Sequence, residues 1–204
     1  MLHSPNFEHE QELITQGYCL IAGIDEVGRG SLAGPVAAAA VILPTTFDSP
    51  WMGEIRDSKL LSPAKREYLS PLIKQIAVSV GIAMIPSEEI DSSNIVEATK
   101  QAMCQAVNLL KESPDFLLID FMKLPTVYIP QQGIVHGDRI SLSIACASIV
   151  AKVARDHYMM GMDEQYPGYE FSRHKGYGTK YHRECIRKHG PCEIHRRSFL
   201  KRLL

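Results

Sequence analysis

The chain has 204 residues, a length that suits one domain with a full hydrophobic core. Its composition, with 45% hydrophobic residues, 22% charged residues and a net charge of −1, is typical of a soluble globular protein. Residues 1–16 lack the apolar core of a signal peptide and no apolar run approaches the ~20 residues of a membrane span, so we expect a cytoplasmic protein.

Two apolar strands are predicted near the N-terminus, at residues 20–25 and 36–43. The short connection through Gly34 and Pro35 favours a hairpin between them. Residues 24–30 contain two adjacent carboxylates and two glycines on either side of an arginine. Buried carboxylates are usually paired or bound to metal, so this segment indicates a cation site beside a phosphate-binding turn.

The middle of the chain alternates helices and strands. A helix is predicted to begin with Ser62 as its N-cap and Pro63 in its first turn, and to end near residue 75. A strand follows at residues 78–85, and Asn94 begins a longer helix whose apolar residues recur at steps of three and four.

The remaining elements continue the α/β pattern. Phe116–Asp120 is predicted as a short strand, and a second extended piece at residues 134–135 leads to Asp138. Residues 141–158 form a predicted helix rich in small residues, so another element must pack closely against it. A loop at residues 173–179 precedes two short basic helices, and the whole pattern predicts a mixed sheet with helices.

Charge is concentrated at the C-terminus. Residues 173–204 contain ten Lys or Arg and two acidic residues, whereas residues 1–172 contain twelve basic and twenty-one acidic residues. A basic segment of this kind indicates a polyanionic partner. A solvated helix with a positive face is the alternative, and charge alone does not separate the two interpretations.

Three apolar segments deliver carboxylates near their C-terminal ends: Asp25 with Glu26, then Asp120, then Asp138. Ligands of open α/β sheets gather outside the carboxyl ends of the strands, so we expect these acids to converge. Converging acids repel one another unless cations lie between them, and oxygen ligands suit Mg²⁺ or Mn²⁺. Two such ions can assist an in-line phosphoryl displacement.

One geometric difficulty concerns the adjacent pair Asp25 and Glu26. Neighbouring side chains of a strand point to opposite faces, so both cannot enter one site from a regular strand. Either the strand ends at Asp25 and the backbone turns, or Glu26 contributes less directly.

Taken in order, the motifs resemble the signature of ribonuclease HII, the bacterial type 2 ribonuclease H. The related type HIII enzymes lack an intact Gly-Arg-Gly triplet and carry an extra N-terminal domain, so this chain resembles type HII. The matching segments cover residues 25–30, 34–36, 57–62, 119–120, 137–138, 148–156, 174–179 and 195–199.

The resemblance implies a ribonuclease H-like fold, with a mixed five-stranded sheet flanked by helices. It implies one catalytic domain over residues 1–204, with a basic helical extension from about residue 166. The implied activity is endonucleolytic hydrolysis of the RNA strand of RNA–DNA hybrids, with cleavage 5′ of single ribonucleotides in duplex DNA. The products would carry 3′-hydroxyl and 5′-phosphate ends, and two Mn²⁺ or Mg²⁺ ions would serve the substrate complex.

The resemblance also assigns site residues. Asp25, Glu26, Asp120 and Asp138 would be both the catalytic residues and the metal ligands. The implied substrate contacts are Gly28, Arg29 and Gly30 at the 2′-hydroxyl, Tyr177 on the sugar, and Lys59, Arg155 and Lys175 at phosphates. Phe121 and Met122 depart from the family pattern, which has glycine after the third acid, and their bulk could reshape that loop.

Other interpretations remain open at this point. A metal-free nucleic-acid-binding module would use the Gly-Arg-Gly loop and the basic C-terminus, but it leaves the acids unexplained. Five scattered cysteines argue against a disulfide framework. A zinc site from Cys185, His189, Cys192 and His195 has tighter spacing than usual, so unliganded side chains on a basic helix are favoured.

No catalytic role is assigned to His174 or His182, which flank the second glycine loop, because metal ions can activate the water. We expect a monomer, and the sequence identifies no segment for contact with a sliding clamp, although the resemblance leaves that partner open.

Overall fold

The computed structural model describes residues 4–46 and 49–201. Its centre is a five-stranded sheet in the order β3-β2-β1-β4-β5. The hairpin partners β1 and β2 are antiparallel, as are β2 and β3, whereas β4 and β5 continue parallel to β1, which confirms the predicted mixed sheet. The strands are β1 (Ile21–Val27), β2 (Val36–Ile42), β3 (Ser79–Ile85), β4 (Phe116–Asp120) and β5 (Gln131–Ile134).

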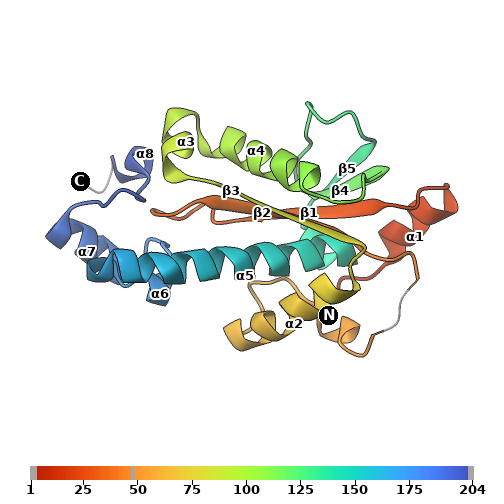
Figure 1. Cartoon of the computed structure of the whole chain (residues 1–204), viewed down its shortest axis with the longest axis horizontal. Helices are drawn as coiled ribbons and strands as arrows, with labels where there is room; N and C mark the ends of the chain where they lie inside the picture. Colours follow the sequence, from red (N-terminus) through yellow and green to blue (C-terminus); the bar gives the residue numbers. More distant parts are fainter. Residues whose placement is uncertain (1–3, 47–48, 202–204) are drawn as a thin grey trace.

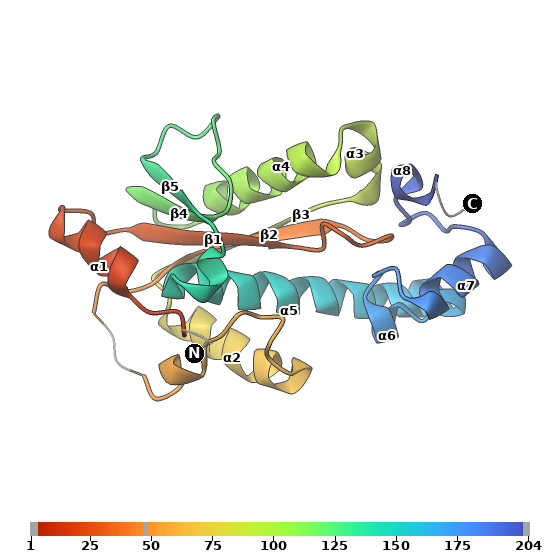
Figure 2. The same ribbon diagram turned by 180° about the vertical axis from the view of Figure 1, so that it is seen from behind.

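Helices cover both faces of this sheet. Figures 1 and 2 show α3 and α4 on one face, α2 and α5 on the other, and α6, α7 and α8 gathered at one end of the molecule. The helices are α1 (Glu8–Thr15), α2 (Pro63–Ile76), α3 (Ser87–Ser92), α4 (Ile95–Asn108), α5 (Leu142–Gln165), α6 (Phe171–His174), α7 (Lys180–His189) and α8 (Arg197–Leu200), with 3-10 turns η1 (Met52–Glu54), η2 (Gly137–Arg139) and η3 (Pro167–Tyr169).

The predicted helix starts are confirmed by their caps. The Ser62 hydroxyl accepts a hydrogen bond from the Lys65 N–H at 3.2 Å, and Pro63 follows in the first turn. The Asn94 side chain accepts from the N–H groups of Val96 and Glu97. These contacts satisfy backbone donors that have no partner within the helix, so both starts follow from local sequence.

Small residues bring α5 close to the sheet. β2 has the sequence VAAAAVI and is buried along its whole length. A Cβ atom on Gly23 of β1 would lie 2.2 Å from the Ser143 carbonyl carbon of α5. Only glycine fits at this position, which confirms the prediction that another element packs closely on the small-residue helix.

Some boundaries differ from the predictions. Helix α5 continues seven residues past the predicted end at residue 158, to Gln165. The short helix α6 occupies the first two residues of the predicted loop at 173–179, and α1 and α3 were not predicted. The short helices α1, α3 and α6 differ from the predictions because packing against the rest of the fold, rather than their own periodicity, fixes them.

The N-terminal helix α1 is anchored through one buried acid. Glu10 lies beside the N-terminus of α5, where its Oε1 accepts from the Ser141 hydroxyl and from the Ser143 N–H and hydroxyl. A carboxylate at a helix N-terminus is stabilised by the free N–H groups there.

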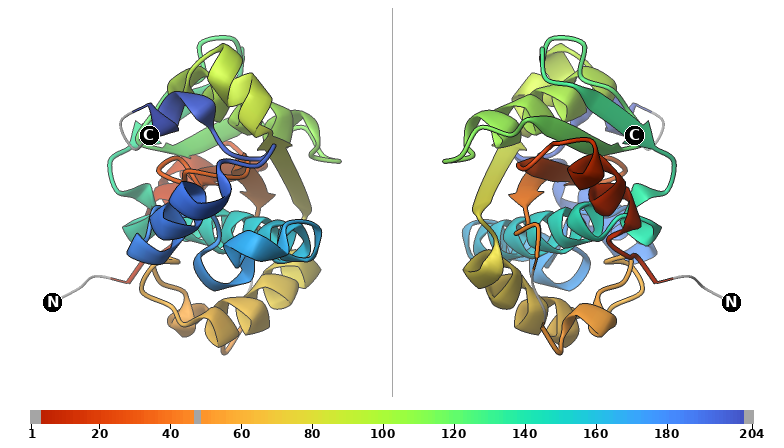
Figure 3. Two further views of the ribbon diagram at one scale, coloured as in Figure 1. Left: turned by 90° about the vertical axis from the view of Figure 1, so that its left-hand side faces the viewer. Right: turned by 90° about the vertical axis from the view of Figure 1, so that its right-hand side faces the viewer.

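The C-terminal extension packs on the end of the β1–β2 hairpin, onto which the left view of Figure 3 looks. Leu32 and Ala33, from the connection between β1 and β2, share an apolar cluster with Phe171 and Ile186 of the extension. Asp91 of α3 accepts hydrogen bonds from the first N–H groups of α8. Residues 202–204 of the predicted extension lie outside the described residues.

Within the described residues, no helix has both the length and the apolar character needed to cross a membrane.

Candidate active site

Three carboxylates meet where β1 and β4 end. Asp25 and Glu26 come from β1 and Asp120 is the last residue of β4. One oxygen from each side chain lies within 4.8 Å of the others, and Asp25 is 4% exposed. The predicted convergence of strand-end acids is therefore confirmed for these three residues.

The expected conflict between Asp25 and Glu26 does not occur. The strand continues to Val27, so the backbone does not turn at Asp25. The pairing of β1 with β4 ends at Ile24 and Ile119, and Asp120 is the last residue of β4, so no β4 residue lies beside Glu26. One Glu26 oxygen nevertheless lies within 4.8 Å of the Asp25 and Asp120 oxygens, so the expectation that both acids cannot enter one site from a regular strand was wrong. The alternative that Glu26 contributes less directly to metal binding stays a prediction.

Burial and mutual repulsion act on this acid group. Burial is the main cause that raises the pKa of Asp25 well above its usual range, with further increases from Glu26 and Asp120. Burial also raises the pKa of Glu26, although Arg29 opposes the shift through an ion pair at 3.3 Å. Acids held together at this cost fit a bound cation, which would remove the repulsion.

Asp138 lies beside this group rather than within it. It sits in η2 and is 5% exposed. Burial, followed by the charges of Asp57 and Asp120, raises the pKa of Asp138 to about 6. The Asp120 Oδ1 accepts from the Gly137 N–H at 2.7 Å, so the turn that carries Asp138 is tied to the acid group. Its role as a metal ligand stays a prediction.

Lys59 is surrounded by carboxylates. Burial disfavours its charge, but the acids Asp138, Asp57, Asp25 and Asp120 outweigh burial and raise the pKa of Lys59. Lys59 was predicted to contact a phosphate of the substrate, whereas no role was predicted for Asp57. Asp57 is buried and accepts from Arg139 Nε at 3.1 Å and from Arg139 Nη2 at 3.0 Å. Asp57 could have been found from the sequence, because it lies two residues before Lys59 in the same motif.

A pocket of about 200 Å³ opens next to the acids. It brings together five of the predicted substrate-binding residues with further side chains for which no role was predicted. The lining residues are Glu26, Val27, Gly28, Arg29, Gly30, Ser58, Lys59, Ser148, Lys152 and Tyr177.

The two glycines of the loop differ in their surroundings. Gly28 has a φ of 91°, and a Cβ atom there would lie 2.2 Å from Arg155 Nε, so packing and backbone conformation both require glycine. Gly30 is exposed, and a Cβ atom there would meet nothing within 4 Å. Packing does not require glycine at position 30, and the predicted substrate contact of Gly30 stays a prediction.

The predicted phosphate contact of Arg155 is wrong. This side chain is 0% exposed, so a phosphate cannot reach it. Its guanidinium donates to the carbonyl oxygens of Pro35, Lys175 and Ala33. Arg155 therefore joins the loop after Gly28 to the loop before Tyr177. The Lys175 ammonium donates to the Ser172 carbonyl and does not line the pocket, so its own phosphate contact stays a prediction.

A second buried arginine supports the backbone of the Gly-Arg-Gly loop. Arg196 is 0% exposed, and its Nη1 donates to the Arg29 carbonyl at 2.9 Å while its Nε donates to the Gly34 carbonyl at 3.0 Å. Burial, followed by repulsion from Arg155, lowers the pKa of Arg196 to about 9. The C-terminal extension thus fixes the backbone of the Gly-Arg-Gly loop.

Phe121 does not displace the acid before it. The residue has a φ of 62°, the left-handed conformation that glycine adopts most easily, and its side chain is 65% exposed. The bulky ring points away from the core, so the loop accommodates it without moving Asp120 out of the acid group.

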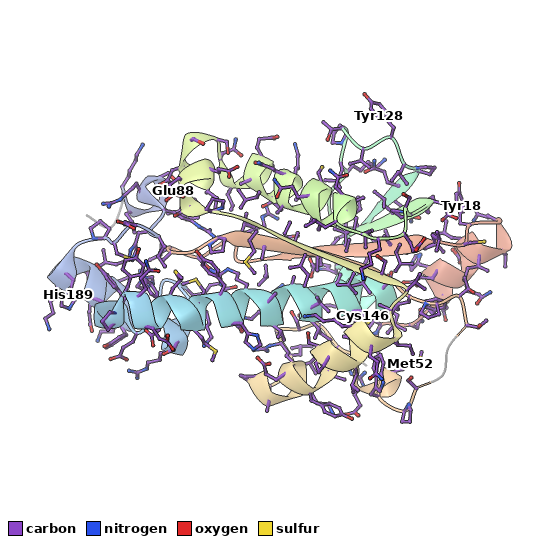
Figure 4. The ribbon with its side chains drawn as sticks, in the orientation of Figure 1. Tyr18, Met52, Glu88, Tyr128, Cys146 and His189 are labelled. Atoms are coloured by element: carbon purple, nitrogen blue, oxygen red, sulfur yellow. The ribbon has the colours of Figure 1, made fainter. Side chains whose placement is uncertain are left out.

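The zinc alternative is contradicted. Among the described residues, which include all four proposed ligands, only the three strand-end acids form a group that could hold a metal ion. His189 is exposed on α7 at one end of the molecule (Figure 4). His195 is buried, and its ring is hydrogen-bonded to His182.

Comparison with known proteins gives the family. The model of the ribonuclease HII family matches residues 22–202. The chain belongs to the ribonuclease HII family. Ribonuclease HII from Dehalococcoides mccartyi strain BAV1 is 54% identical over 195 residues, which cover 96% of this chain and 92% of that protein. Family membership makes the chain a ribonuclease H, a hydrolase.

Solved structures share the fold. RNase HII in the PCNA complex from Archaeoglobus fulgidus superimposes with a TM-score of 0.71 at 23% identity, covering 90% of this chain and 96% of that one. Bst-RNase HIII in complex with Mn²⁺ gives a TM-score of 0.59 at 18% identity, covering 85% of this chain and 64% of that one. At these identities the likeness establishes the ribonuclease H-like fold alone.

Proposed function

We propose that this protein hydrolyses the RNA strand of RNA–DNA hybrids and cuts on the 5′ side of single ribonucleotides in duplex DNA. The products carry 3′-hydroxyl and 5′-phosphate ends. The observation that carries the proposal is the meeting of Asp25, Glu26 and Asp120 beside a pocket lined by the Gly-Arg-Gly loop and Tyr177.

The acid group fits a hard divalent cation. Its donors are carboxylate oxygens only, and burial raises the pKa of Asp25 and of Glu26, so a cation would relieve an unfavourable arrangement. Asp25, Glu26 and Asp120 would hold Mg²⁺ or Mn²⁺, and Asp138 beside them would complete a site for a second ion. Such ions activate water and stabilise the charge that develops on a phosphate. The Mn²⁺ complex of Bst-RNase HIII supports this assignment.

The pocket residues supply recognition. Gly30 leaves space for a nucleotide at the loop backbone, whose polar groups would contact the 2′-hydroxyl that distinguishes RNA from DNA. Tyr177 would stack its ring on the sugar at the RNA–DNA junction. Lys59, and Lys152 beside the Tyr177 ring, offer positive charge to the phosphates at the mouth of the pocket.

A pair of matched DNA duplexes tests the proposal. A DNA duplex with one ribonucleotide is incubated with the protein and Mg²⁺ or Mn²⁺, next to the same duplex without the ribonucleotide. Cleavage is expected 5′ of the ribonucleotide in the first duplex only, and Asp25→Asn is expected to abolish it. Cleavage at the 3′ side, or an active Asp25→Asn variant, would contradict the proposed chemistry.

The metal-free binding module is not favoured. Three acids beside a phosphate-binding loop repel nucleic acid unless they hold cations, and the family consists of hydrolases. Tight hybrid binding without hydrolysis in a titration of divalent metals would reverse this preference.

Several broader predictions accompany this function. We propose one catalytic domain over residues 1–204, supported by the apolar cluster that joins the extension to the β1–β2 connection. A monomer, a cytoplasmic location and a role in ribonucleotide removal from DNA are further predictions. The PCNA complex of the Archaeoglobus fulgidus protein supports a test of sliding-clamp binding for this chain.

A further inference from the structure

A chain of buried hydrogen bonds runs through the C-terminal extension to the backbone of Tyr177. His182 is 0% exposed and His195 is 1% exposed. The His182 Nδ1 lies 2.9 Å from the Tyr177 carbonyl oxygen, and its Nε2 lies 3.1 Å from His195 Nε2. On the far side of the second ring, His195 Nδ1 lies 3.0 Å from both the N–H and the Sγ of Cys192.

These partners determine which ring nitrogen carries each proton. A carbonyl oxygen only accepts, so His182 Nδ1 must be the donor to Tyr177 and the neutral ring keeps a lone pair on Nε2. His195 must then donate from Nε2, which leaves its Nδ1 to accept from Cys192. Every hydrogen bond in the chain points from Cys192 towards Tyr177.

The electrostatics agree with this neutral chain. Burial is the main cause that lowers the pKa of His182 and of His195 to about 4, with a smaller contribution from His174 at His182 and from His182 at His195. Burial raises the pKa of the Cys192 thiol to about 11, so it keeps the proton that it donates. At neutral pH the side chains of Cys192, His195 and His182 are therefore uncharged, and each donates its hydrogen bond towards Tyr177.

A third histidine fixes the residue before Tyr177. The ring of His174 stacks on His182 with centroids 4.2 Å apart, and its Nδ1 accepts from the Gly176 N–H at 3.2 Å. The Gly176 carbonyl in turn accepts from the Leu32 N–H at 2.8 Å. The histidines therefore hold the backbone on both sides of the Tyr177 Cα and connect it to the chain after the Gly-Arg-Gly loop.

We propose that His182 is a positioning residue, which fixes the Tyr177 ring at the pocket through the Tyr177 carbonyl, and that His195 and Cys192 set its tautomer. The inference rests on the proposed contact of Tyr177 with substrate. The Tyr177 ring lies half-buried at the pocket, 5.5 Å from Lys152 Nζ, so its direction depends on the backbone that carries it. A ring held in advance loses less entropy when the sugar binds.

Two substitutions of His182 separate a positioning role from simple core filling. His182→Asn retains an N–H donor near the place of Nδ1, whereas His182→Leu fills the space without a donor. We expect His182→Leu to raise the KM for the single-ribonucleotide duplex about five- to tenfold with little change in kcat, which matches the loss of one hydrogen bond. His182→Asn should stay within about twofold of the parent. His189→Leu, the same change on the exposed face of α7, is the matched control and should leave KM unchanged.

A double-mutant cycle with Tyr177→Ala completes the test. If His182 acts through Tyr177, the KM penalty of His182→Leu disappears once the Tyr177 ring is removed. A raised KM for Tyr177→Ala with an equal His182→Leu penalty in both backgrounds would overturn the inference and leave the proposed function intact. An unchanged KM for Tyr177→Ala would overturn the proposed substrate role of Tyr177, and the inference with it.

Nitrogen-15 NMR of the imidazoles gives a readout that is independent of activity. The expected result is a proton on Nδ1 of His182 and on Nε2 of His195 at neutral pH. The opposite tautomer at His182 cannot donate to the Tyr177 carbonyl and would overturn the inference even if every kinetic result were as expected.

Discussion

The Asp120 carboxylate accepts a hydrogen bond from the Gly137 N–H at 2.7 Å, which ties the end of β4 to the turn that precedes Asp138. The partners are 17 residues apart in the sequence, and the contact sets the position of Asp138 next to the acid group. Asp138 therefore lies beside the group of Asp25, Glu26 and Asp120, in which one oxygen of each side chain lies within 4.8 Å of the others.

The two glycines of the Gly-Arg-Gly loop should respond differently to alanine. Gly28→Ala places a Cβ against Arg155 in a left-handed backbone, so we expect a loss of about 2–4 kcal/mol in unfolding free energy. Gly30→Ala meets open space and should leave stability unchanged while it weakens binding of the single-ribonucleotide duplex. Urea unfolding and a binding titration measure the two effects, and equal stability losses would contradict the distinction.

Removing one acid should stabilise the protein when no metal is added. Asp25→Asn removes a buried negative charge and its repulsion by the neighbouring acids, the two causes that raise the pKa of Asp25. The free energy of unfolding in EDTA should therefore increase by roughly 1 kcal/mol. The parent should gain stability on addition of Mg²⁺ or Mn²⁺, because the ion binds the folded state, and Asp25→Asn should gain much less. Thermal melts with and without metal measure both effects. A parent protein whose melting temperature does not change when these metals are added would count against the metal site.

Phe121 offers a test of backbone strain next to the site. Its φ of 62° costs an L-residue about 1–2 kcal/mol, and its exposed ring contributes little packing. Phe121→Gly should therefore raise unfolding free energy by about 0.5 kcal/mol after the greater chain entropy of glycine is subtracted. Phe121→Ala keeps the Cβ and the strain, so it is the control that should show no gain.

Acid should weaken the fold through the buried histidines. The pKa of His182 and of His195 is lowered from 6.5 to about 4 in the folded protein, mainly by burial. Between these values the unfolded chain binds more protons, so their contribution to stability is complete above pH 6.5 and is lost as the pH falls towards 4. His174, Cys192 and Arg197 are the other titratable groups that act on His195 or on His182.

Measuring stability against pH needs a control, because the acids of the site change the free energy of unfolding in the opposite direction. Their raised pKa values make protonation favour the folded state, so they add stability as the pH falls. A double variant with His182→Asn and His195→Gln removes the two imidazoles and keeps the acids. Urea unfolding between pH 7 and pH 4 should show a smaller loss in this variant, and identical pH profiles would refute the histidine contribution.

Local features were predictable from the sequence. The caps at Ser62 and Asn94 use donors within three residues, so the sequence alone specifies where α2 and α4 begin. The strands that carry Asp25 and Asp120 were predicted from short apolar runs, and the order of motifs gave the family that the comparisons confirm.

The tertiary structure decided which of these residues share a site. Arg155 contacts Pro35 across 120 positions of sequence and becomes a buried support, although a basic residue in a family motif favoured a phosphate contact. Glu26 joins the acid group because β4 ends before it, which depends on the register between two strands about 95 residues apart. Sequence specified the chemical groups, whereas burial and strand register, which arise from long-range packing, determined which groups face the pocket.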